Sequence, residues 1–461
     1  MPLPSRQSLP FGDRLLNSIV DEQLTIYRTP NRSRLFYLSS GANELDPPPL
    51  YRYFLQLEYD KSELHKSYTY GVGYPPLFKI VSVYETFRSG KQVASRLLQS
   101  HFGVITFGAA GGIAAAFYLI AQEQPLKVLQ IDYSYPIFER AVNQLGGEIY
   151  QVLPENPTKP VEAEDAVRAI RHVRPNIVVL NNTSNPTGQS YDIPFLERVF
   201  RTVKETGAWI VYDRSCEFDV GPDSECDPVT IALREGIINR LIIVNSISKT
   251  CSLPGLRLGW VFSPNPLAKK IGQWQVYLSE NPSMVGVIPL IVDLWLRMEY
   301  MAERSAGGLE YPNRRELAQI FDSDGLIRAW KSRQFFHQIL ISKEMDEIYK
   351  RHIHHFETNV RIFHHNFEVF KSLVGAKLGN YPTTFKGLNV MVSRRDFELK
   401  DPVRVTSDLL HETYVSIVPA ACFVANVNRS KDNESYFRLS LGTKPSQFRA
   451  AVKRFAEWSP K

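Results

Sequence analysis

The chain has 461 residues, 44% of them hydrophobic, so it can bury a large core, and one large and one small domain are expected at this length. Its formal net charge of +6 is spread along the sequence and is too small for a nucleic-acid footprint, so we expect no nucleic-acid partner. The sequence has no run of about 18 apolar residues and no apolar signal core. We therefore expect a cytoplasmic protein without a membrane partner. The four cysteines lack the spacing of a zinc site or a disulfide framework.

Residues 1–60, rich in Pro and Tyr, are predicted to form an N-terminal arm and part of a small domain. Residues 61–300 contain β-branched runs that are typical of buried strands, at Gly103–Phe107, Lys127–Ile131, Asn176–Leu180, Trp209–Tyr212 and Leu241–Val244. Helical patterns lie between them, at Ile113–Gln122, Ile137–Leu145, Ala163–His172 and Phe195–Glu205. This alternation predicts an α/β fold in which a mainly parallel sheet is covered by helices on both faces, and 61–300 is predicted to be the large domain.

The pattern changes after residue 300. Residues 301–345 are polar and Arg-rich and are predicted to be an insertion or linker. A long helix is expected over Ser342–Phe370, and its five histidines, at 352, 354, 355, 364 and 365, are interpreted as a solvated helix face rather than a metal site. The later strands, at Leu388–Val392, Tyr414–Val418 and Phe437–Leu441, place a small α+β domain at 346–461.

A lysine follows the last strand of the large domain, in the segment Ser246-Ile-Ser-Lys249-Thr-Cys-Ser-Leu-Pro-Gly-Leu-Arg257-Leu-Gly259. The carboxyl end of a strand in an α/β sheet lies at a crevice, and a lysine shielded from water there can attack a carbonyl as a neutral amine. The alternative is a surface lysine in a turn. The segment resembles the cofactor-lysine segment of the class I/II aminotransferases, a family of fold type I enzymes that use pyridoxal 5'-phosphate.

This resemblance implies that Lys249 carries the cofactor as a Schiff base and then acts as the general base of the reaction. It also implies that Ser246 and Arg257 hold the cofactor phosphate, where the arginine offers a planar fork to two oxygens. The fold implied is aspartate-aminotransferase-like. In that fold a large cofactor-binding domain with a mainly parallel seven-stranded sheet, flanked by helices, is joined to a smaller α+β domain.

Two strand ends carry further motifs of that family. Asn182-Thr-Ser-Asn185-Pro-Thr-Gly188 matches its Asn-Pro-Thr-Gly turn, which implies that Asn185 binds the phenolic oxygen of the cofactor and contacts the substrate. Trp209-Ile-Val-Tyr-Asp213 ends in a carboxylate, which by the same resemblance pairs with the pyridine nitrogen and keeps the ring cationic. A plain turn is the alternative for both segments.

Three more contacts with the cofactor follow from the resemblance. Gly108, Ala109 and Ala110 open an Ala-rich helix directly after a strand, so that backbone N–H groups can cradle the phosphate. Tyr135 is implied to stack on the cofactor ring. Tyr68, with Tyr70 as the competing choice, is implied to reach the phosphate in the other subunit, so that a homodimer with shared active sites is expected. A glycine loop without a ligand and a core tyrosine are the alternatives.

The C-terminal strand contains Phe437-Arg438-Leu-Ser-Leu-Gly442, and the resemblance implies that Arg438 forms a bidentate pair with the substrate α-carboxylate. Gly41, where the resemblance begins, is implied to contact the substrate as well. An exposed strand arginine is the alternative for Arg438. No metal ligand is expected.

The expected activity is transamination of an amino acid or related amine with a 2-oxo acid. The same site can also support a lyase, decarboxylase or oxidase reaction, and this is the alternative. Three departures from the family pattern favour a role in specialised metabolism. Cys216 stands where a tyrosine is usual, Ala420 stands where a glycine is common, and residues 303–335 form a longer segment than is usual. An inactive scaffold is disfavoured because no structural need explains Asp213, Lys249 and Arg438 together.

Overall fold

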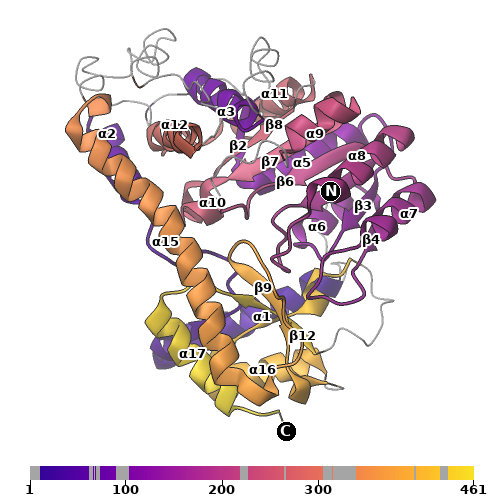
Figure 1. Cartoon of the computed structure of the whole chain (residues 1–461), viewed down its shortest axis with the longest axis vertical. Coiled ribbons are helices and arrows are strands. Elements are labelled where there is room, and N and C mark those ends of the chain that lie inside the picture. The colour runs from indigo at the N-terminus through magenta and orange to yellow at the C-terminus, as the bar shows by residue number, and fades with distance from the viewer. Residues whose placement is uncertain are drawn as a thin grey trace. The chain divides into compact units, whose positions relative to one another are not determined.

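The computed structural model describes residues 11–61, 66, 68, 73–89, 103–218, 227–263, 266–304, 314, 339–398, 401–425 and 435–460 (Figure 1). The chain divides into two compact units. Unit 1 comprises residues 1–45, 124–191 and 359–461, and unit 2 comprises residues 46–123 and 192–358. The domain ranges expected from the sequence stay a prediction, and most of the expected insertion at 301–345 lies outside the described residues.

Seven strands form the main sheet, in the order β2-β8-β7-β6-β5-β3-β4. Their bounds are β2 Gly103–Phe107, β3 Lys127–Ile131, β4 Glu148–Val152, β5 Ile177–Asn181, β6 Trp209–Asp213, β7 Leu241–Ser246 and β8 Leu258–Phe262. Strand β8 runs antiparallel to both of its neighbours, whereas β6 is parallel to β7, and β3 is parallel to β4 and β5. The α/β fold with a mainly parallel seven-stranded sheet is therefore confirmed.

The five strands predicted in this sheet are present, with ends that differ by at most two residues. Strands β4 and β8 were not predicted. Residues of β4 alternate between exposed or partly buried and buried, and this strand lies at an edge of the sheet. Strand β8 is buried throughout, but its first two residues are the last two of the lysine segment, so the sequence did not indicate a separate strand there. Helical covers are formed by α5 Gly108–Ala121, α6 Ile137–Gln144, α7 Ala163–Val173, α8 Ile193–Thr206 and α9 Pro228–Glu235.

The core of unit 2 is centred on α12 (Val287–Arg304), which is buried from Val287 to Ala302 and packs against α2 (Pro49–Lys61) and α3 (Pro75–Phe87). Figure 1 shows α3 and α12 side by side. Two N–H groups at the start of α12, those of Gly286 and Ile288, donate to the carboxylate of Glu58, each at 2.8 Å. This carboxylate satisfies donors that a helix start leaves unpaired. The remaining helices of the unit are α10 Ile247–Thr250 and α11 Leu267–Ser279.

Unit 1 contains β3, β4 and β5, a three-stranded sheet in the order β11-β12-β9, and a short parallel pair of β1 with β10. Their bounds are β1 Phe36–Tyr37, β9 Asn389–Ser393, β10 Val415–Ser416, β11 Val418–Pro419 and β12 Tyr436–Ser440. The strand predicted over 414–418 is thus two short strands that pair with different partners. Helix α1 (Phe11–Tyr27) packs against residues 420–423, and the C-terminal helices are α16 Pro402–Thr413 and α17 Pro445–Glu457.

The long helix is confirmed as α15 (Lys343–Val374), but His352 is not on a solvated face. It is fully buried, and its Nε2 lies 2.7 Å from Oδ1 of Asp293, which also pairs with Arg297 at 2.7 Å. The Arg297 guanidinium and His352 hold the pKa of Asp293 well below its usual range against the effect of burial. Helical spacing alone could not reveal a buried acid on another helix.

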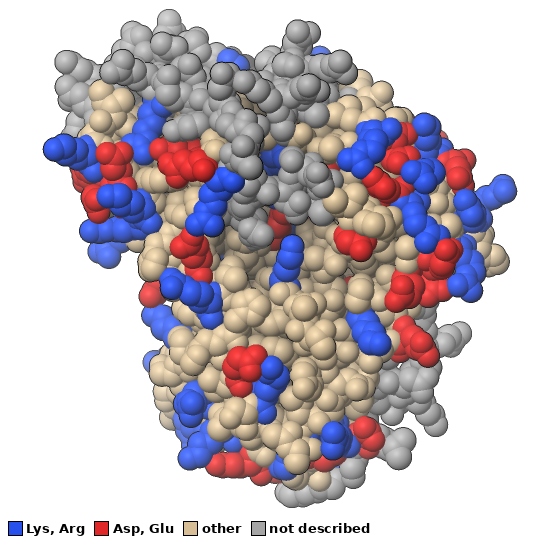
Figure 2. Space-filling view, viewed as in Figure 1, with Lys and Arg blue, Asp and Glu red and all other residues tan. Residues whose placement is uncertain are grey.

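The surface carries charges of both signs. Figure 2 shows basic and acidic side chains interspersed over the described part of the visible face. Among the described helices, none combines the length and the apolar character that crossing a bilayer requires.

Candidate active site

The turn between β2 and α5 in unit 2 forms an anion cradle. Thr106 Oγ1 donates to the carbonyl oxygen of Gly108 at 2.9 Å, and Gly108 adopts a φ of +67°, which favours glycine. No side chain caps the first turn of α5, so its N–H groups at Ala109 and Ala110 are left for another partner, whereas the Gly108 N–H is bonded to a backbone carbonyl. A helix start of this kind suits the phosphate of a cofactor, because N–H groups and the helix dipole both favour negative charge.

Arg257 completes this cradle from the segment that follows the lysine. The Gly108 N–H donates to the Arg257 carbonyl at 3.0 Å, and the Arg257 guanidinium donates to the carbonyls of Phe107 at 3.2 Å and Pro254 at 2.9 Å. A Cβ on Gly108 would lie 2.8 Å from Arg257 Nη2. The guanidinium therefore lies against the turn, and it is exposed, so that a phosphate can reach it.

Gly259 allows β8 to pack closely against the backbone of the turn between β2 and α5. It is in register with Thr106 on β2, and a Cβ added to it would lie 2.5 Å from the carbonyl carbon of Gly108 and 2.7 Å from the nitrogen of Ala109. Contacts this short with backbone atoms cannot be relieved by a side-chain movement. The backbone of the cradle is therefore positioned by the absence of a side chain at 259.

Lys249 and Asp213 follow neighbouring parallel strands of unit 2. Asp213 ends β6 in register with Val244 of β7, and the partly buried Lys249 lies on α10, which begins one residue after the buried Ser246 that ends β7. Burial raises the pKa of Asp213, and hydrogen bonds from Ser215 and the positive charge of Lys249 oppose this shift. The carboxylate is thus partly desolvated and within electrostatic reach of the lysine.

The sequence analysis missed a buried network of ion pairs that begins at the residue next to Asp213. Arg214 points away from the strand end and pairs with Glu85 at 2.7 Å and with Asp227, while Glu85 accepts from Trp260 Nε1 at 2.7 Å. These partners lie far apart in the sequence, so no local motif announces them. Because breaking a buried ion pair is costly, the network fixes the backbone that carries Asp213.

In unit 1, Arg438 of β12 lies beside the Asn-Pro-Thr-Gly turn. Its Nη1 donates to Asn185 Oδ1 at 3.1 Å and its Nη2 donates to the carbonyl of Ser39, while its guanidinium lies 5.0 Å from the ring centre of Phe423. A Cβ on Gly41 would lie 2.6 Å from Nη2. The unit therefore brings together Arg438, Asn185 and Gly41, the three residues that were predicted to bind the substrate.

Asp132, which was not predicted, organises the same turn. It accepts from Thr187 Oγ1 at 2.8 Å and from the Tyr133 N–H at 2.7 Å, and it has a φ of 75°. Burial raises its pKa to about 6, against the lowering effect of these hydrogen bonds. The carboxylate thus links the end of β3 to the turn that carries Asn185.

The remaining predicted residues are placed as follows. Tyr135 of unit 1 is 41% exposed, and Tyr68 of unit 2 is 84% exposed. Tyr70 lies outside the described residues. Cys216, three positions after Asp213, is buried. Unit 2 thus assembles the predicted phosphate, lysine and aspartate positions, whereas unit 1 assembles the predicted substrate positions.

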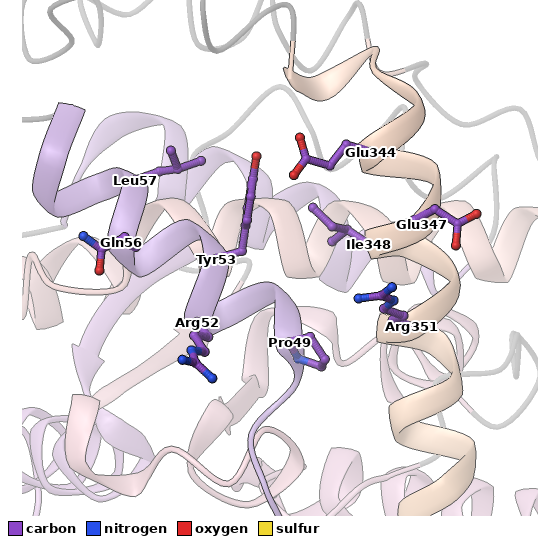
Figure 3. A pocket seen from close by; sticks show the side chains of 9 residues that line it. All are labelled: Pro49, Arg52, Tyr53, Gln56, Leu57, Glu344, Glu347, Ile348 and Arg351. Carbon is purple, nitrogen blue, oxygen red and sulfur yellow. The ribbon is translucent and has the colours of Figure 1, made fainter.

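A separate pocket of about 720 Å³ lies in unit 2 between α2 and the first turns of α15 (Figure 3). Its apolar floor is formed by Tyr53, Leu57 and Ile348, and charged side chains, among them Arg52 and Glu344, line its rim. None of the predicted site residues lines it.

Comparison with known proteins agrees with the fold. A family model described as aminotransferase class I and II matches residues 90–455. An aspartate aminotransferase of Streptomyces avermitilis is 26% identical over 245 residues, which are 53% of this chain and 58% of that protein. Kynurenine–oxoglutarate transaminase 1 of Mus musculus is 24% identical over 253 residues, 51% of this chain and 56% of that protein. The chain therefore matches somewhat more than half the length of these relatives.

The similarity of fold extends over the whole chain. The crystal structure of an aminotransferase from Mycobacterium tuberculosis has a TM-score of 0.70 at 18% identity, and the alignment covers 100% of this chain and 99% of that chain. The aspartate-aminotransferase-like fold predicted from the sequence is confirmed.

Proposed function

The chain belongs to the aminotransferase class I and II family, whose cofactor is pyridoxal 5'-phosphate, and we propose that it transfers the amino group of an amino acid or related amine to a 2-oxo acid. The observation that carries this proposal is the uncapped start of α5 with the Arg257 guanidinium against it, on the same sheet edge as Lys249 and Asp213. These residues fit a phosphorylated aldehyde cofactor, because they offer an anion cradle, an amine and a carboxylate.

Each side chain has one task in this proposal. The N–H groups of Ala109 and Ala110 donate backbone hydrogen bonds to the phosphate, and Gly108, whose own N–H is bonded to the Arg257 carbonyl, lets the phosphate approach the turn. Ser246 and Arg257 add a hydroxyl and a bidentate guanidinium. Tyr135 supplies an aromatic face for the cofactor ring.

Asp213 holds a proton on the pyridine nitrogen, and the cofactor, when bound, then supplies an electron sink for the substrate carbanion. Lys249 anchors the cofactor covalently. With the cofactor bound, the Lys249 amine, when it is not engaged as the anchor, would act as the general base that takes the substrate Cα proton and would hold that proton for its return. Because Lys249 is partly buried, water competes poorly for this proton.

Substrate recognition in the proposal rests on Arg438, which binds the α-carboxylate, and on Asn185 and Gly41 beside it. Asn185 also donates to the phenolic oxygen of the cofactor. The close approach of Gly41 to the guanidinium supports this assignment, because a side chain at 41 would block that end of Arg438. We expect the substrate to be an amino acid or related amine with a carboxylate.

The proposal includes a homodimer with shared active sites. The high exposure of Tyr68 supports it, because a tyrosine that reaches another subunit is uncovered in a single chain. Sedimentation at micromolar concentration tests this part, and a fully active monomer would contradict it.

The central test combines a covalent and a chemical measurement. Borohydride should fix the cofactor on the peptide that contains Lys249, and Lys249→Ala should abolish this adduct, while Lys270→Ala, an exposed lysine paired with Glu123, should retain it. A screen of amino acids should then show conversion of the bound cofactor to its aminated form with release of a 2-oxo acid. Release of ammonia, carbon dioxide or peroxide would instead favour the lyase, decarboxylase or oxidase alternative.

A further inference from the structure

Asn389 is the first residue of β9 and contacts the turn that carries Asn185. Two buried polar side chains, Asn389 and Arg438, bind Asn185 there. Its Nδ2 donates to Asn185 Oδ1 at 3.2 Å, and Arg438 Nη1 donates to the same oxygen at 3.1 Å. Asn389 is 2% exposed and Arg438 is 4% exposed. Water therefore has little access to replace either hydrogen bond.

The backbone explains why these side chains meet. Arg438 is opposite Met391 in the antiparallel pair of β12 and β9, so Asn389 is its diagonal neighbour on the same face of the sheet. The turn approaches β9 closely because Gly188 has no side chain, and a Cβ there would lie 2.3 Å from the Asn389 carbonyl oxygen. The Lys386 N–H also donates to the Gly188 carbonyl at 2.8 Å. The contact is thus set by strand register and by a backbone approach.

The chemistry of the three groups fixes the orientation of both amides. An arginine has only donors, so the atom of Asn185 that faces Arg438 must be its oxygen. Asn389 must in turn present its NH₂ group to that oxygen. With both acceptor positions of Asn185 Oδ1 occupied, the Asn185 Nδ2 group, which lies on the other side of Cγ in the same plane, points away from Arg438 and Asn389.

We propose, on the basis of the proposed function, that Asn389 is a positioning residue that holds the Asn185 amide with Nδ2 turned away from Arg438, as the donor to the phenolic oxygen of the cofactor. Arg438 alone holds this orientation only until a substrate carboxylate arrives, because the carboxylate draws on the same guanidinium. Asn389 keeps the amide fixed when that happens.

The consequence is measurable in the holoenzyme without turnover. A donor to the phenolic oxygen competes with the internal hydrogen bond from the protonated nitrogen that links Lys249 to the cofactor. Loss of that donor therefore stabilises the protonated form and moves the pH midpoint of the visible absorbance upward.

Asn389→Asp provides the strongest perturbation. A carboxylate is an acceptor only, so it can accept from the neighbouring Arg438 guanidinium in place of Asn185 Oδ1 and draw the Asn185 Nδ2 group toward itself, which turns Oδ1 toward the cofactor. We expect the midpoint of the absorbance titration to rise by about one pH unit, the size of one hydrogen bond. Asn389→Leu removes only one of the two donors to Asn185, since Arg438 remains, and should give a smaller rise. Asn380→Asp is the matched control, because the partner of Asn380 is the Tyr436 hydroxyl, which can donate to a carboxylate.

The order of the shifts separates orientation from packing. A shift in Asn389→Leu equal to or larger than that in Asn389→Asp would assign the effect to packing and overturn the proposal, as would a shift in Asn389→Asp no larger than in Asn380→Asp. If Asn389→Asp does not fold, Asn389→Leu decides, because an unchanged midpoint in a folded Leu variant contradicts the role. A wild-type protein without a cofactor absorbance would overturn the proposed function itself, and this outcome is distinguishable from the others.

Discussion

Substitution of Gly259 by alanine should weaken cofactor binding, although Gly259 itself is not among the residues proposed to contact the cofactor. The added Cβ would lie 2.5 Å from the carbonyl carbon of Gly108, 2.7 Å from its Cα and 2.7 Å from the nitrogen of Ala109. Favourable contacts between carbon atoms are about 3.5–4.0 Å long, so the cradle must move away by about 1 Å. All three atoms belong to the backbone, and Gly259 itself is held in register between β2 and β7.

The expected cost follows from this geometry. Overpacking of a well-packed interior destabilises by about 1–3 kcal/mol. The displaced atoms belong to the turn whose N–H groups are proposed to hold the phosphate, so the same movement should lower cofactor affinity by about tenfold to a hundredfold, at about 1.4 kcal/mol for each factor of ten. Both the free energy of unfolding of the apoprotein and the cofactor affinity should therefore fall.

Gly255→Ala is the matched control within the same segment. Among the described residues, no heavy atom lies within 4 Å of a Cβ at Gly255, in the short helix Pro254–Leu256, so the effect of this substitution should stay within about 0.5 kcal/mol. Absorbance titration of each apoprotein with pyridoxal 5'-phosphate gives the affinities, and thermal unfolding with and without cofactor gives the stabilities. If Gly259→Ala binds the cofactor as tightly as Gly255→Ala, the assignment of the phosphate to the start of α5 is refuted.

Three further outcomes can be checked. The folded-state pKa of Asp132 is about 6, against an ordinary value of 3.8. The contribution of Asp132 to stability is therefore complete below pH 3.8 and is lost as pH rises through 6. Urea titrations should show that the free energy of unfolding falls by about 3 kcal/mol over this range, and that Asp132→Asn lacks this fall. Glu58→Ala should lower the free energy of unfolding by about 1–3 kcal/mol, seen in thermal unfolding, because the N–H groups of Gly286 and Ile288 lose their acceptor, and an unchanged stability would contradict this capping role. Arg438→Lys should raise the KM of an α-amino acid by about tenfold and spare an amine without a carboxylate, since an ammonium cannot form a bidentate pair; equal effects on both substrates would rule out the assigned role.

The sequence was sufficient to predict those strands of the main sheet in which the local residue pattern agrees with burial. The run Lys127–Ile131 is a strand with the predicted bounds, and the lysine segment follows a buried strand as expected. The sequence was insufficient to predict helix α12. That helix is buried on all sides, so it has no polar face to give a helical period, and its charged residues suggest a surface position. Asp293, Arg297 and Glu299 are buried because each finds a partner, Asp293 in Arg297 and His352, and Glu299 in Arg314.

The candidate site shows the same division. Residues that lie in contiguous motifs, such as Lys249 and Asn185, could be proposed from the sequence because the motif itself contains them, and their roles stay predictions. Asp132 and Asn389 could not, because their roles depend on contacts with residues 55 and 204 positions away. Such contacts arise from strand register and from the close backbone approach at Gly188. The residue pattern of one strand gives information on neither.

In each unit, taken by itself, a buried group binds next to a motif residue or to its side chain and holds it in place. Arg214 is tied to Glu85 and Asp227 next to Asp213, and Asn389 is tied to Asn185. A buried group that loses its partner costs about 1–3 kcal/mol, or more when it is charged, so these anchors resist rearrangement of the motif residues beside them. Substitution of an anchor should therefore alter the orientation and proton affinity of the motif residue before it abolishes ligand binding, whereas substitution of the motif residue removes the contact itself.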